Sequence, residues 1–123
     1  MKNEFKFKKE NSLKNRQFKL QNIKNNFPDK IPLIIQKYKN SELPEYQKDK
    51  FLVPDFFTIN DLINYFKKRF DIGAEYELIL YLNEDNYVES KNLSITEIYD
   101  QYKDQEDGFL YLYYTNSLIE KDN

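Results

Sequence analysis

The run Phe27-Pro28-Asp29-Lys30-Ile31-Pro32-Leu33-Ile34-Ile35 marks the place where a helical pattern gives way to a strand. Pro28 ends the helical pattern, because the residue before a proline is driven out of the α region. The apolar and β-branched residues that follow predict a strand over Ile31–Lys37. The first helix–strand junction of the chain is therefore expected at Phe27.

Three other runs predict further strands. Lys50-Phe51-Leu52-Val53-Pro54 is expected to be the second strand, closed by its proline after a charged loop. Near the end, Asp107-Gly108-Phe109-Leu110-Tyr111 enters through a glycine turn, and we expect the last strand over Phe109–Tyr114. A nearly continuous apolar run over Glu77–Asn83 predicts a central strand of the sheet, with both faces covered.

Helical spacing of apolar residues predicts three helices. The first spans Leu13–Phe27 and carries one narrow apolar stripe with lysines elsewhere. The second spans Thr58–Arg69 and opens with an N-cap residue. The third is short and begins at Ser94, where Glu97 completes a capping box. Upstream, two phenylalanines at positions 5 and 7 leave a short helix and a loose segment as open alternatives.

The predicted element order is a helical arm followed by ββαβαβ. This is an α+β chain with the β-grasp order of ubiquitin, and its 123 residues suit one domain with one core. The chain has no cysteine and no histidine, which removes disulfides, the usual zinc sites and imidazole bases. The carboxylates Asp104, Glu106 and Asp107 lie in one turn without a partner base, so we expect neither an enzyme nor a cofactor.

Charge is divided unevenly along the chain. Residues 1–26 hold eight Lys or Arg and two Glu, a net charge of +6. The remainder holds eleven Lys or Arg and nineteen Asp or Glu, a net charge of −8. A basic arm on an acidic body suits nucleic acid, anionic lipid or acidic peptides, and a solvated helix face explains it equally well. No apolar run fits a signal peptide or reaches the about 20 residues of a membrane span, so a soluble intracellular protein is expected.

Alternation along the strands sorts their residues by face, because successive side chains of a strand point to opposite sides. On the first strand, Pro32 and Ile34 are expected to share one face, with Ile31, Leu33 and Ile35 on the other. On the second strand, Lys50 and Leu52 oppose Phe51 and Val53, and on the last strand Phe109 and Tyr111 oppose Leu110 and Leu112. The helix over Thr58–Arg69 can cover only one of these faces, which leaves the other to the first helix.

In order and spacing, these runs resemble the ubiquitin-like modifiers of autophagy, the family of GABARAP and the microtubule-associated light chain three proteins. The resemblance spans roughly residues 5–114. It implies a helical arm over 1–26, a ubiquitin-like domain over 27–114 and a C-terminal tail over 115–123. It also implies a cytoplasmic, autophagosome-associated monomer that binds linear motifs of cargo receptors and adaptors and needs no metal or nucleic acid.

The resemblance places two pockets beside the second strand, which would pair with an aromatic-x-x-aliphatic peptide by β-augmentation. The aromatic pocket would be formed by Ile23, Pro32, Ile34, Lys50, Leu52 and Phe109. The aliphatic pocket would be formed by Phe51, Val53, Pro54, Phe57, Leu62 and Tyr65. Lys30, Lys48 and Arg69 would meet the acidic flank of the motif. Lysine at position 30 replaces the usual arginine and loses a bidentate contact.

One departure concerns membrane attachment. Family members end in an aromatic residue and a glycine, which a protease exposes and an enzyme cascade joins to phosphatidylethanolamine. Glu120 and Lys121 stand where that pair is expected, and the glycines, Gly73 and Gly108, lie upstream. We therefore expect that the chain as printed is not lipidated. Two explanations stay open: the chain is shortened or altered at its end, or it is a paralogue that acts only as an adaptor. The maturation protease and the lipidation enzymes would be partners only of a form that ends in glycine.

A nucleic-acid-binding module is the alternative from another class. It would use the basic arm, with phenylalanines 5, 7 and 18 stacking on bases between lysines. The acidic body opposes this alternative, because it would repel phosphates.

Overall fold

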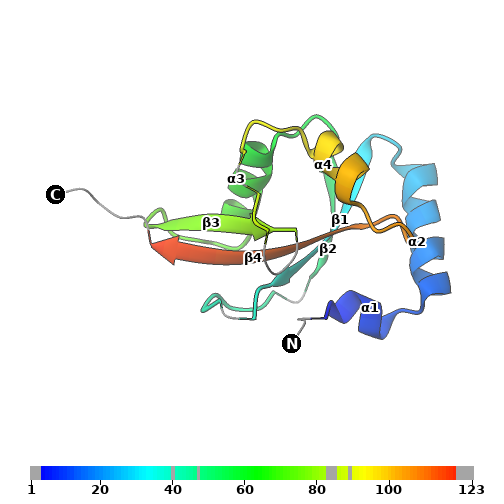
Figure 1. Ribbon diagram of the computed structural model, residues 1–123, viewed down its shortest axis with the longest axis horizontal. Helices are drawn as coiled ribbons and strands as arrows, with labels where there is room; N and C mark the ends of the chain where they lie inside the picture. Colours follow the sequence, from blue (N-terminus) through cyan, green and yellow to red (C-terminus); the bar gives the residue numbers. More distant parts are fainter. Residues whose placement is uncertain (1–3, 40, 47, 83–85, 89, 119–123) are drawn as a thin grey trace.

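The computed structural model describes residues 4–39, 41–46, 48–82, 86–88 and 90–118. A four-stranded sheet lies between two sets of helices, with α1 and α2 against one face and α3 and α4 against the other (Figure 1). The elements in chain order are α1 Lys6–Glu10, α2 Leu13–Asn26, β1 Lys30–Lys37, β2 Lys50–Pro54, α3 Ile59–Arg69, β3 Tyr76–Tyr81, α4 Ile95–Tyr102 and β4 Leu110–Leu118.

The strand order in the sheet is β2-β1-β4-β3. β1 runs antiparallel to β2 and parallel to β4, while β3 runs antiparallel to β4. The parallel pair joins the first and last strands in the middle of the sheet, with Leu33 opposite Leu110. This topology confirms the predicted α+β, ubiquitin-like β-grasp fold with a helical arm in front.

Short polar side chains begin the three longer helices, and those of α3 and α4 lie at the positions that the sequence predicts. Thr58 and Asp61 form a reciprocal capping box at α3, in which the Thr58 amide donates to Asp61 Oδ2 at 2.9 Å. Ser94 accepts the amide of Glu97 at the start of α4. Ser12 does the same for α2, and these bonds satisfy backbone donors that the first turn of a helix leaves unpaired.

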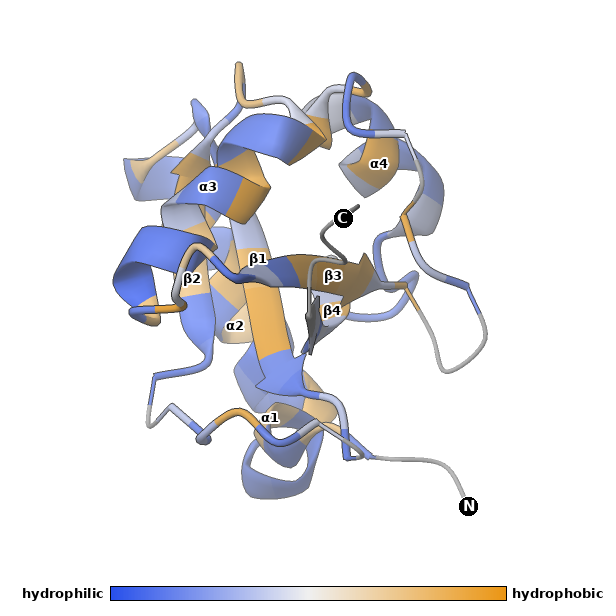
Figure 2. Cartoon of the chain, turned by 90° about the vertical axis from the view of Figure 1, so that its left-hand side faces the viewer, coloured by the Kyte–Doolittle hydropathy of each residue, from blue (hydrophilic) through white to orange (hydrophobic). Residues whose placement is uncertain are grey.

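The two faces of the sheet bury two separate groups of apolar side chains. The main core lies under α3 and α4 and includes Leu33, Phe51 and Leu110. The second core lies under α1 and α2 and consists of the buried residues Phe7, Ile23, Ile34, Phe109 and Tyr111, with Phe5, Leu20 and Leu52 packed against them. Figure 2 shows the apolar colouring along β1, a strand that contributes side chains to both cores.

The face assignment from alternation is confirmed by this division. Ile31, Leu33 and Ile35 lie in the main core, whereas Ile34 lies in the second core. Phe109 likewise lies in the second core, on the face of the sheet opposite to that of Leu110. The helix predicted around Leu13 also forms, and it covers the face that α3 leaves open.

Two strand predictions are wrong. The run over Glu77–Asn83 is not a central strand: β3 lies at the end of the sheet, and its buried side chains, Leu78 and Leu80, face only the main core. The last strand does not stop at Tyr114 but continues to residue 118, because residues 115–118 pair in register with β3. The first four residues assigned to the C-terminal tail therefore belong to the sheet.

The open question about the start of the chain is answered by α1. Phe7 is 6% exposed and packs edge-on against Phe109, with ring centroids 5.1 Å apart. Phe5 stacks on Tyr113 at 4.3 Å. Two of the three rings proposed for base stacking thus pack against other rings of the protein, Phe7 buried and Phe5 half-buried, and Phe18 is the one that is largely exposed.

Candidate functional site

The predicted peptide-binding strand, β2, lies at the end of the sheet opposite β3. It pairs on one side with β1, in a register that sets Leu52 opposite Pro32 and Lys50 opposite Ile34. In the part of the chain that the structure describes, no strand pairs with its outer side. Such an edge presents backbone N–H and C=O groups to an added strand.

The residues predicted for the aromatic pocket come together on the α2 side of β2. Ile23, Ile34 and Phe109 are at most 7% exposed and form part of the second core. Pro32 is also buried, while Lys50 and Leu52 are half-buried on the edge strand. These residues therefore form a buried apolar cluster, with one aliphatic and one cationic side chain at its partly exposed edge.

The residues predicted for the aliphatic pocket lie on the α3 side of the same strand. Phe51, Val53 and Leu62 are almost fully buried in the main core. Phe57 and Tyr65 are half-buried, with ring centroids 6.3 Å apart, and Tyr65 also meets Phe51 edge-on at 6.4 Å. Pro54, likewise half-buried, ends β2 beside them. Partly exposed rings over a buried floor make this a second apolar surface.

The predicted cations are spread around both pockets. Lys48 Nζ lies 5.1 Å from the ring centroid of Phe51, and the Arg69 guanidinium carbon lies 5.8 Å from it. Lys50 lies on the same face of β2 as Leu52. Lys48 and Lys50 are therefore on opposite sides of the edge strand. Lys30 begins β1 opposite Pro54, at the far end of β2. An acidic peptide lying along β2 would meet positive charge at either end.

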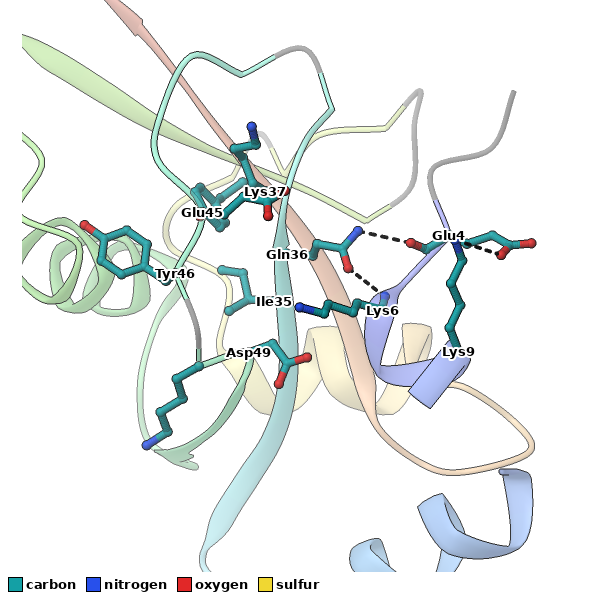
Figure 3. A pocket seen from close by; sticks show the side chains of 11 residues that line it. Glu4, Lys6, Lys9, Ile35, Gln36, Lys37, Glu45, Tyr46 and Asp49 are labelled. Atoms are coloured by element: carbon teal, nitrogen blue, oxygen red, sulfur yellow. Dashed lines mark hydrogen bonds and ion pairs between the residues drawn. The ribbon is translucent and has the colours of Figure 1, made fainter. Parts of the chain in front are cut away.

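A small cavity of about 180 Å³ opens between α1, β1 and the chain before β2 (Figure 3). Gln36 ties its two sides together, because it accepts the Lys6 amide at 2.7 Å and donates to the Glu4 carbonyl at 3.1 Å. Lys48 and Asp49 from the approach to β2 line the cavity as well. The arm thus contacts β1 close to the residues that lead into the edge strand β2.

The acidic turn before β4 has a role that the sequence did not reveal. Asp107, whose side chain is fully buried, accepts Arg16 Nε from α2 at 2.8 Å. Lys8 Nζ from α1 donates to Asp104 at 2.6 Å, and Gln17 donates to the Glu106 carbonyl at 2.9 Å. Part of the basic arm is therefore neutralised within the molecule. The sequence feature that could have revealed this contact is the opposite charge of the basic arm and the acidic turn, two segments far apart in the sequence.

Comparison with known proteins shows the family to which this chain belongs. The family model described as "Autophagy protein Atg8 ubiquitin like" matches residues 15–119. The chain belongs to the Atg8 family. An autophagy-related protein 8-like protein of Dictyostelium discoideum is 37% identical over 112 residues, covering 89% of this chain and 87% of that protein. Autophagy-related protein 8 of Pichia angusta is 37% identical over 109 residues, covering 89% and 85%.

The fold of this Atg8-family chain also matches a solved relative. The crystal structure of Trypanosoma brucei ATG8 superimposes with a TM-score of 0.87 at 30% identity, covering 96% of this chain and 99% of that one. The chain is thus an autophagy-related, ubiquitin-like protein, as its sequence indicates. No helix in its described part is long and apolar enough to cross a membrane. Glu120 and Lys121, on which the lipidation prediction depends, lie outside the described residues.

Proposed function

We propose that this Atg8-family protein is a non-catalytic adaptor that binds acidic aromatic-x-x-aliphatic peptides along β2. The observation that carries the proposal is the edge strand itself, which has a different apolar cluster on each face. A peptide added as a fifth strand would gain backbone hydrogen bonds along its length. Cargo receptors and autophagy factors with such motifs would then be its partners on autophagic membranes.

The spacing of the motif follows from the two faces of the edge. The aromatic residue would enter over Leu52 toward Ile23 and Phe109, and the aliphatic residue would lie over Phe57 and Tyr65. The buried residues beneath both motif positions are already packed in the free protein, so binding would not have to assemble the core. Pre-formed pockets lower the ordering cost of association.

The cations favour acids beside the motif. Lys48, Lys50 and Arg69 surround the predicted peptide path, and each would attract a carboxylate more strongly at low salt. Replacing Lys50 with alanine should therefore slow association and weaken its salt dependence more than it changes the shape of either pocket. Maturation and lipidation enzymes would be further partners of any product that carries a terminal glycine.

The binding test uses a fluorescent acidic peptide with tryptophan and leucine at the two motif positions. We expect a Kd in the micromolar range, about −8 kcal/mol. Leu52→Ala should weaken binding by about 1–3 kcal/mol, because it removes a side chain from the pocket mouth. Ile79→Ala is the matched control, since Ile79 is a half-buried residue of β3, the strand at the other end of the sheet.

Two results would overturn the proposal. The first is equal binding by the wild type and a Leu52→Ala, Phe51→Ala double variant that retains the native circular dichroism spectrum. The second is a larger loss in Ile79→Ala than in Leu52→Ala, which would place the peptide at the β3 end of the sheet.

A further inference from the structure

One buried carboxylate connects the helical arm to the backbone of the aromatic pocket. Asp107 Oδ1 accepts the amide of Phe109 at 2.9 Å, and Oδ2 accepts the Tyr111 hydroxyl at 2.5 Å. The same Oδ2 accepts Arg16 Nε at 2.8 Å. A single side chain thus joins α2, the turn and two residues of the second core.

Arg16 extends this link to the junction between α1 and α2. Its Nη1 donates to the Asn11 carbonyl at 2.8 Å, so one guanidinium holds both the inter-helix segment and the Asp107 carboxylate. The Arg16 side chain is 11% exposed and that of Asp107 is 0% exposed, so water competes little for this pair. A charged pair with little access to water keeps a well-defined geometry when its hydrogen bonds are complete.

Tyr111 acts as a neutral donor in this cluster. Burial and the hydrogen bond to Asp107 raise the pKa of Tyr111 well above its usual value of 10.0. The hydroxyl therefore keeps its proton throughout the physiological range. Its bond holds the carboxylate against β4.

The position of Phe109 depends on this cluster. Its amide is bound by Asp107, and its carbonyl accepts the Asp104 amide at 2.8 Å. The preceding carbonyl, of Gly108, accepts the Tyr99 hydroxyl at 2.7 Å. The fully buried ring of Phe109 then packs with Ile23, which α2 supplies to the same pocket. The cluster therefore fixes both the strand side and the helix side of the pocket floor.

We propose that Arg16 and Asp107 are positioning residues for peptide recognition, which set the shape of the aromatic pocket without touching the peptide. This inference rests on the peptide-binding function proposed above. Loosening the carboxylate would let Phe109 and α2 shift relative to each other. The effect would fall on the aromatic position of the motif and spare the aliphatic position, because the aliphatic pocket belongs to the main core on the other face.

The experiment measures affinity for three acidic peptides by wild type and variants. One peptide carries tryptophan and leucine at the motif positions, one has alanine for tryptophan, and one has alanine for leucine. Asp107→Asn keeps the side-chain size but turns an amide group toward Arg16 and removes the negative charge. Lys8→Gln is the control, because it breaks the ion pair with Asp104 on the same turn and leaves the bond to the Phe109 amide in place.

In Asp107→Asn, the preference for tryptophan over alanine should fall about tenfold, equivalent to about 1.4 kcal/mol. The preference for leucine over alanine should stay as in the wild type, and Lys8→Gln should keep both preferences. If Asp107→Asn does not fold, Tyr111→Phe replaces it, since it removes one bond to the same carboxylate. It should lower the tryptophan preference about threefold.

The outcomes separate this inference from the proposed function. A role confined to stability would lower the melting temperature and leave both preferences unchanged in the folded protein, which would overturn the inference while peptide binding stands. Equal loss of both preferences would also overturn it. Failure of the wild type to bind any of the three peptides would overturn the proposed function and this inference together.

Discussion

Replacing Gly108 with alanine should destabilise the protein through two separable effects. Gly108 has a φ of +82°, in the left-handed region that side chains disfavour. A Cβ at this position would come within 2.2 Å of Leu20 Cδ2 from α2. The glycine is therefore required both by the turn into β4 and by the close approach of the arm.

The structure gives the size of each effect. A left-handed backbone costs a residue with a Cβ about 1–2 kcal/mol. Forcing a methyl group against a packed leucine costs about 1–3 kcal/mol. The expected loss in the free energy of unfolding is therefore about 2–5 kcal/mol, a large share of the roughly 5–15 kcal/mol of a typical domain.

Urea denaturation of four proteins would test this reasoning: wild type, Gly108→Ala, Leu20→Ala and the double variant. Leu20→Ala removes the atom that the new methyl group meets, so Gly108→Ala should cost only the backbone part in that background. The coupling energy should be about 1–3 kcal/mol. A cost below about 0.5 kcal/mol, or the same cost in both backgrounds, would refute the argument from the clash.

Two further predictions concern the helix start and the acidic turn. Thr58→Ala should lower the free energy of unfolding by about 1–2 kcal/mol in urea, whereas Thr58→Ser should retain most of it; equal losses would contradict a capping role. At Asp104, partial burial raises the pKa, but the hydrogen bond from Lys8 and two backbone amides outweigh it and hold the pKa below the usual 3.8. Because this pKa is lower in the folded state, ionised Asp104 stabilises the fold above pH 3.8. It loses that effect as the pH falls through the pKa of the folded state. The difference in melting temperature between wild type and Asp104→Asn should therefore shrink in acid, and a constant difference would contradict the assignment.

The features that could be predicted from the sequence are those that local pattern determines. Alternation fixes the faces of β1 and β2, because the side-chain period of a strand is two residues. This is why Ile34 is separated correctly from Leu33 on β1, and Leu52 from Phe51 on β2. The capping residue Thr58 is equally local, since its partner lies three positions along the chain.

The features that were missed depend on pairing between distant segments. An apolar run such as that of β3 suits a central or an edge strand, and only its neighbours in the sheet decide between them. The continuation of β4 through Asn116 and Ser117 depends on pairing with β3, because these two residues carry no strand signal of their own. Asp107 looked like a loop acid for the same reason, since its partner Arg16 lies 91 residues away.

The pairing of the arm with the last strand has a consequence for biosynthesis. Arg16 leaves the ribosome long before Asp107, and at translation rates of about 5–20 residues per second their separation of 91 positions takes roughly 5–20 s. During that interval Phe7 and Ile23 have no second core to enter, because Phe109 and Tyr111 have not been made. The newly synthesised arm is therefore an exposed basic and apolar segment, available to chaperones until the final strand is complete.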